Sequence, residues 1–277
     1  MNNKENTFVI DAGSRTPLNL AEIWEFRELL YFFAWRDIKV KYKQTFLGVT
    51  WAFIQPFMMM LVLNLFFGKM LHFPSDKLPY AVFAFTGLII WNIFSNGAVN
   101  SGNSMMTNAV IIKKNYFPRI ILPLSAIIVS LFDFLVSFIL FTGLLIWFRV
   151  MPDFFRFIAF FPLAVIIAIV TTIGTGVIIG AMSIRFRDFR IVMPFVIQLL
   201  LFITPVIYPI SAISNKTLYY VLSLNPMAGA ISLARASLTH NPLDWTIIVI
   251  SAGMSLLIFF AGMLIFKKNE TLISDLA

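Results

Sequence analysis

Residues that could carry chemistry are few in this sequence and lie far apart. The two histidines, His72 and His240, fall outside the long apolar segments, with no HExxH pattern, carboxylate cluster or Ser/His/Asp spacing around them. Metal-assisted hydrolysis therefore lacks ligands. With no cysteine, the chain has no disulfide or thiol redox chemistry. The phosphate-cradling motif GxxxxGK[ST] is also absent, so we expect no enzyme activity, metal or other cofactor on this chain.

One acid, Asp133, falls inside a long apolar segment. A rise of about 1.5 Å per residue, counted from Arg119, places it roughly 20 Å into a membrane. An intramembrane acid is a candidate for proton transfer. The alternative is a structural acid that is hydrogen-bonded to a neighbouring helix or faces a wet cavity.

A basic, partly apolar stretch, NSMMTNAVIIKKNYFPR at residues 103–119, has the pattern of a short helix that could receive force from a partner protein. Its apolar residues share one helical face, and its cations can meet water or an acidic partner. The alternative is an ordinary basic loop. A second candidate contact is Arg187 in SIRFRDFR. The docking candidates are Met105, Met106, Ile112, Lys113, Lys114, Tyr116, Arg119 and Arg187.

Residues 20–43 predict an amphipathic helix that lies in the membrane interface, because Ile23, Phe26, Leu30 and Phe33 follow helical spacing. Such a helix is either a surface anchor or a gate and docking element. Its cations Arg36, Lys39 and Lys41 are candidates for binding phosphate groups.

Aromatic residues make up 16% of the chain, and 31 of them are Phe. Rings along a wide path could stack on the apolar faces of sugars, although Phe in a bilayer also faces lipid and Trp also forms interfacial belts. The candidates are Trp51, Phe53, Phe57, Trp91 and Phe94.

We expect these residues to lie on membrane helices and on the loops that connect them. Of the 277 residues, 60% are hydrophobic and 12% are charged, which excludes a water-soluble domain. Charges separate six apolar windows, each long enough to cross a bilayer core of about 30 Å. Residues 217–234 are also apolar, but Asn225, Pro226 and Gly229 predict a broken re-entrant hairpin between the fifth and sixth spans. The expected spans are residues 48–68, 79–99, 120–148, 157–184, 191–209 and 245–266.

The basic residues predict the orientation of these spans. With the N-terminus inside, 15 of the 21 Lys and Arg residues fall on the cytoplasmic side. Both termini are therefore expected in the cytoplasm, and the net charge of +8 reflects loop asymmetry rather than nucleic-acid binding. Residues 1–18 are expected to form a flexible cytoplasmic tail, and residues 19–277 a single all-α membrane domain.

Several sequence runs resemble the ABC-2 type permeases that export polysaccharides, most closely the O-antigen (lipopolysaccharide) exporter permeases. The resemblance covers nearly the whole chain. The runs are RDIKVKYKQTFLGVTWAFIQP (36–56), PYAVFAFTGLIIWNIFSN (79–96), IIKKNYFPRIILPL (111–124), TPVIYP (204–209) and LNPM (224–227).

The resemblance implies a homodimer in the bacterial inner membrane, paired with a separate ABC ATPase dimer that binds ATP and Mg. The implied substrate is an undecaprenyl-diphosphate-linked glycan. By the same resemblance, residues 20–43 are the interface or gate helix, 103–118 the principal coupling helix and 211–241 the broken hairpin on the periplasmic side. Capsular polysaccharide and teichoic acid remain alternative cargoes. Other readings are a drug or lipid exporter of the same superfamily, an ion-coupled carrier that uses Asp133, and a membrane enzyme or assembly scaffold, against which the absent catalytic motifs count.

Overall fold

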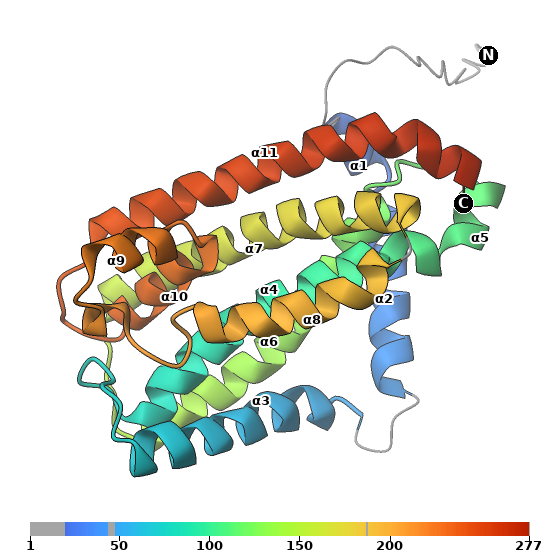
Figure 1. The fold of residues 1–277 in the computed structure, drawn as a ribbon. Helices are drawn as coiled ribbons and strands as arrows, with labels where there is room; N and C mark the ends of the chain where they lie inside the picture. Colours follow the sequence, from blue (N-terminus) through green and yellow to red (C-terminus); the bar gives the residue numbers. More distant parts are fainter. Residues whose placement is uncertain (1–19, 44–47, 187, 277) are drawn as a thin grey trace, which may run out of the picture.

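The computed structural model describes residues 20–43, 48–186 and 188–276, and all regular elements in these ranges are helices. Five are long and apolar enough to cross a membrane, and they run side by side as a bundle (Figure 1). The predicted all-α membrane fold is confirmed. These five segments are α3 with the π-helical turn η1 (Thr50–Leu63 and Asn64–Met70), α4 (Tyr80–Thr107), α6 (Ile121–Trp147), α7 (Phe154–Arg185) and the Trp245–Asn269 part of α11 (Trp245–Leu276).

The fifth predicted span, residues 191–209, is a shorter apolar helix, α8 (Phe189–Ile203). Its 15 residues cover about 22 Å, less than a bilayer core of about 30 Å. We expected this span to continue to residue 209. It stops earlier because Pro205 disfavours helical geometry at the preceding residue, and Thr204 is extended, with φ −71° and ψ 140°. Residues 204–209 therefore form an irregular segment before the 3₁₀ turn η2 (Ile210–Ala212).

The predicted broken hairpin forms two short helices, α9 (Lys216–Ser223) and α10 (Pro226–Ala236). Asn225 starts the second helix, because its side-chain oxygen accepts a hydrogen bond from the Met227 N–H (3.0 Å) and Pro226 tolerates the first helical position. Ser251 of α11 fixes the break, since its hydroxyl donates to the Ser223 carbonyl (2.9 Å) and accepts from the Gly229 N–H (3.0 Å). The hairpin is thus bonded to the bundle.

Helix α4 forms the centre of the molecule, and most of its residues are buried. It packs against α6, α7 and α10. Close approach to α7 depends on small residues. A Cβ on Gly176 would lie only 2.5 Å from the Ser101 Oγ.

The predicted interface helix forms two pieces, α1 (Leu20–Glu25) and α2 (Arg27–Lys43), and α2 runs across the bundle near one end (Figure 1). Phe33 and Ala34 of α2 are buried, and the Phe33 ring contacts the Phe117 ring at 5.7 Å. The same end carries α5 (Ala109–Lys114) and is called the α5 end below. The opposite end, with α9 and α10, is called the hairpin end. The predicted tail, residues 1–18, lies outside the described residues.

Candidate functional site

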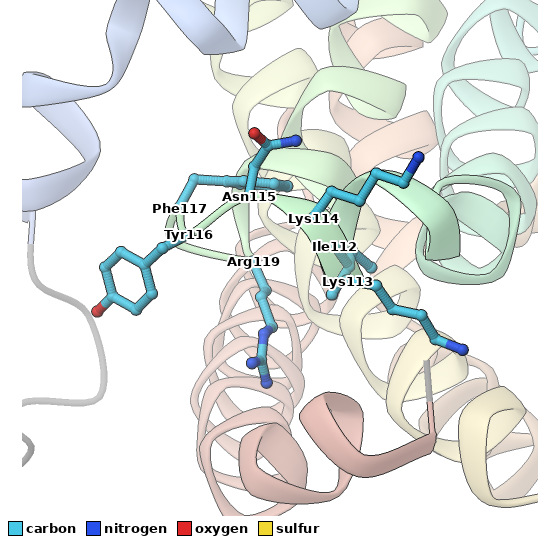
Figure 2. Close-up of a pocket in the computed structure, with 7 residues that line it drawn as sticks. All are labelled: Ile112, Lys113, Lys114, Asn115, Tyr116, Phe117 and Arg119. Carbon is cyan, nitrogen blue, oxygen red and sulfur yellow. The ribbon is translucent and has the colours of Figure 1, made fainter.

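The predicted docking residues gather at the α5 end, where a cleft of about 230 Å³ opens between α5 and the start of α6. Figure 2 shows the side chains of Lys113 and Lys114 pointing to one side, Tyr116 to the other and Arg119 away from both. Lys113, Lys114 and Tyr116 are exposed. This basic, exposed surface, which is called the docking surface below, could bind an acidic partner. The lining residues are Ile112, Lys113, Lys114, Asn115, Tyr116, Phe117 and Arg119.

The docking stretch is not the single helical face that its spacing predicts. Helix α4 continues through Met105 and Met106 to Thr107, and α5 starts only after a break at Asn108. Met105 (1% exposed) and Ile112 (9% exposed) point into the core, and Met106 is half-buried. The expectation that all of them face a partner is therefore corrected. The buried residues anchor the stretch, and Tyr116 and the lysines form its surface. Arg187, the second candidate contact, lies outside the described residues.

Asn108 links this break to α2. Its side-chain N–H donates to the Ser104 carbonyl (2.9 Å), and its side-chain oxygen accepts a hydrogen bond from Arg36 (2.8 Å). Arg36 also pairs with Asp37 at 2.7 Å. The guanidinium of Arg36 therefore already has two protein partners.

The other two candidate cations of α2 differ in their surroundings. Lys39 is exposed, and its ammonium lies over the Trp35 ring at 5.3 Å from the centroid. Lys41 forms an ion pair with Asp133 of α6. The Tyr42 hydroxyl also donates to Asp133. Burial, followed by the hydrogen bond and charge of Asp133, raises the pKa of Tyr42, so this phenol stays protonated and remains a donor.

Asp133 lies near the middle of α6 (Ile121–Trp147). One turn further along α6, the Ser137 hydroxyl donates to the carbonyl of Ala52 (3.3 Å), near the start of α3. The depth of Asp133 in a membrane, counted from Arg119, stays a prediction. The structure gives Asp133 the alternative role, that of a structural acid bonded to a neighbouring helix.

The five candidate aromatic residues separate into two groups. Trp51 is 51% exposed on α3, and Phe53 and Phe57 stack on each other at 6.2 Å and are partly exposed. Trp91 (4% exposed) and Phe94 (6% exposed) are packed inside the central helix α4 and contact each other at 5.3 Å. The expectation that these two face a glycan path is corrected, because α4 is surrounded by other helices.

Sequence reasoning missed one buried cation. Arg235 of α10 is not among the candidate residues predicted from the sequence, and it is only 5% exposed. Its guanidinium donates to four backbone carbonyls and lies over the Phe83 ring at 3.4 Å. The acceptors are Phe83 (3.2 Å), Pro205 (2.6 Å), Val206 and Tyr208 (3.5 Å).

A signal for this site was present in the sequence. The segment TPVIYP at 204–209 breaks a hydrophobic helix, and the carbonyls that it frees need donors in a membrane. Arg235 meets that need. Gly87 makes room for it, since a Cβ there would lie 2.7 Å from the guanidinium.

The described helices, five of them long and apolar enough to cross a membrane, define a multi-pass membrane protein. The family model for the ABC-2 type transporter matches residues 28–239. The chain therefore belongs to the ABC-2 type transporter family.

Several characterised proteins are similar along most of their length. The O-antigen export system permease protein RfbA of Myxococcus xanthus is 28% identical over 251 residues, which is 90% of this chain and 95% of that protein. A Klebsiella pneumoniae protein of the same name is 28% identical, over 87% of this chain and 92% of its own length. The polysialic acid transport protein KpsM of Escherichia coli is 24% identical, over 85% and 91%.

Proposed function

We propose that this chain is the permease subunit of an ATP-driven ABC transporter that exports an undecaprenyl-diphosphate-linked polysaccharide, the O-antigen, from the cytoplasmic to the periplasmic side of the bacterial inner membrane. The observation that carries the proposal is the similarity, over about nine-tenths of the chain, to permeases named for O-antigen export. The family match at residues 28–239 includes nearly all of α2, the docking surface and the hairpin.

The energy for export comes from a separate ATPase in this proposal. The sequence holds no GxxxxGK[ST] motif, so ATP and Mg bind on the partner. An ABC ATPase dimer docks at the α5 end, which faces the cytoplasm together with both termini. The exposed Lys113, Lys114 and Tyr116 support this position for the contact.

The functional unit in the proposal is a homodimer. In the single chain, α3 and α8 carry exposed apolar residues along much of their length, such as Phe66 on the α3 segment and Phe195 on α8. A second copy would cover part of these faces, and the partly exposed Trp51, Phe53 and Phe57 would line the glycan path. ATP binding then shifts the dimer between states that the ATPase binds with different affinity.

Export in cells tests this proposal. Deleting the gene should leave lipid-linked glycan inside the cell and remove O-antigen from the surface, and a plasmid copy should restore it. Immunoblots of surface and total glycan measure both pools. Normal surface O-antigen in the deletion strain would contradict the proposed cargo.

A second candidate cargo is capsular polysaccharide, because the polysialic acid transport protein is similar over 85% of the chain. The same deletion strain distinguishes the two. Loss of capsule with intact O-antigen would identify capsular polysaccharide as the cargo. Loss of wall teichoic acid would identify teichoic acid as the cargo. Export driven by a proton gradient without the ATPase would favour an ion-coupled carrier.

A further inference from the structure

The strongest unassigned feature is the contact between the end of α2 and α6. Lys41 and Tyr42 of α2 both bind Asp133 of α6, and Lys41 also lies beside the Tyr42 ring at 5.4 Å. These three residues are called the α2 latch below. They join an interface helix rich in cations to a helix of the membrane bundle.

The two charges of the latch differ in their access to solvent. The Lys41 side chain is 38% exposed, whereas the Asp133 side chain is 12% exposed. An anion that approaches from outside therefore reaches the ammonium of Lys41, while the carboxylate lies behind it. The carboxylate of Asp133 therefore competes with any phosphate group for the ammonium of Lys41.

The surrounding charges favour an anionic ligand. Residues 36–43 read RDIKVKYK, with four cations and one acid, Asp37, which already pairs with Arg36. Lys39 and Lys43 are exposed. Attraction between several ammonium groups and a multiply charged phosphate exceeds that for a singly charged headgroup. A diphosphate is thus a stronger competitor than the phosphate of an ordinary phospholipid.

Release of the latch would reach the docking surface through α2. The Arg36 guanidinium donates to Asn108 (2.8 Å) at the break between α4 and α5. The Phe33 ring contacts Phe117 (5.7 Å), which lines the cleft beside Tyr116. A movement of α2 therefore acts on both sides of the docking stretch.

We propose that the α2 latch is a substrate sensor: a lipid-linked diphosphate displaces Asp133 from Lys41, frees the end of α2 from α6 and passes this change to the docking surface through Arg36 and Asn108. The inference rests on the proposed function, which supplies a diphosphate ligand. Asp133 is a positioning residue in this scheme. Diphosphate binds only those molecules in which Lys41 is free of Asp133. The apparent affinity therefore equals the intrinsic affinity multiplied by the fraction of such molecules.

The affinity test uses the complex of permease and ATPase in phosphatidylcholine nanodiscs, with geranylgeranyl diphosphate as the probe and ATP hydrolysis as the readout. Asp133→Asn should lower the half-saturating diphosphate concentration about tenfold, because the competitor loses its charge. Lys41→Gln should raise it about tenfold. Tyr42→Phe, which removes one hydrogen bond and keeps the ring, should lower it about threefold and serves if Asp133→Asn does not fold. Asp244→Asn at the hairpin end is the matched control.

Probe identity separates the sources of phosphate. Geranylgeranyl monophosphate should act more weakly than the diphosphate, and geranylgeraniol should have no effect. If nanodiscs of phosphatidylglycerol produce the full effect without diphosphate, the ligand is the bilayer surface and the sensor proposal is overturned.

A distance measurement tests the movement itself. The chain has no native cysteine, so spin labels at Val40→Cys and Leu135→Cys, both on exposed positions, report the α2 to α6 separation, and singly labelled variants identify the distances between subunits. Diphosphate should lengthen this distance in the wild type, and Asp133→Asn should show the longer distance without ligand. An unchanged distance at saturating diphosphate, or an unchanged half-saturating concentration in Asp133→Asn and Tyr42→Phe, overturns the latch while export in cells remains the separate test of function.

Discussion

At the residue scale, Arg235 is the side chain with the clearest structural role. Its guanidinium donates to backbone carbonyls of residues 204–209, an irregular segment after α8. It also donates to the Phe83 carbonyl and so connects α10 to α4. Buried backbone carbonyls without donors are costly where water is absent. Arg235 therefore holds together the hairpin end of the bundle.

Replacement of Arg235 by Met should destabilise the protein by about 3 kcal/mol or more, since several buried carbonyls lose a charged donor. Thermal unfolding in detergent, followed by intrinsic fluorescence, measures the change. The control is Lys216→Met, which removes an exposed cation at the same end. An unfolding temperature equal to that of the control would show that Arg235 is dispensable.

At the element scale, the crossing of α7 and α11 depends on glycines whose backbones touch. A Cβ on Gly262 would lie 2.5 Å from the Gly174 carbonyl oxygen, whereas a Cβ on Gly253 of the same helix meets no atom within 4 Å. The two positions form a matched pair for substitution.

Gly262→Leu should destabilise the bundle by about 1 to 3 kcal/mol, because the two helices must move apart. Gly253→Leu should leave stability nearly unchanged. Differential scanning fluorimetry measures the unfolding temperatures of both variants. Equal temperatures would mean that the crossing of α7 and α11 tolerates a side chain at residue 262.

A second prediction at the element scale concerns the docking surface. Reversing both charges in Lys113→Glu/Lys114→Glu should reduce co-purification with the ATPase about tenfold or more, because a complementary surface becomes repulsive. Lys69→Glu/Lys216→Glu carries the same charge change at other exposed positions and is the control. Equal recovery of the ATPase with both variants would exclude the α5 end as its docking place.

The elements could be predicted from sequence better than their contacts. Apolar length and charge spacing predicted the five long helices, but they predicted a longer α8 than the structure has; the Asn225-Pro226 pair predicted the broken hairpin. The same reasoning placed Met105 on a docking face, because it assumed that one helix continues unbroken through this stretch. The break at Asn108 depends on tertiary packing, which spacing does not encode.

The contacts of the site residues could be predicted only where the residues are neighbours in the chain. Lys113, Lys114, Tyr116 and Arg119 line one cleft, since they are neighbours in the chain, and their docking role stays a prediction. The partners of Lys41 and Arg235 were not predictable, because they lie 92 and up to 152 residues away. Only a three-dimensional fold brings such residues into contact.

At the scale of the whole molecule, the chain is a transport subunit of the ABC-2 family whose sequence holds no nucleotide-binding motif. The long helices provide a frame, α2 and the docking surface lie at one end, and the hairpin lies at the other (Figure 1). In the proposed function, an ATPase binds at the α5 end and drives a conformational change across the bundle. We therefore expect the activity of the chain to depend fully on that partner.

Reconstitution measures this dependence most directly. Proteoliposomes that contain the permease alone should not move lipid-linked glycan, with or without ATP or a proton gradient. Adding the ATPase and ATP should start transport, and a hydrolysis-deficient ATPase should not. Glycan transport by the permease alone, under either energy source, would contradict the account.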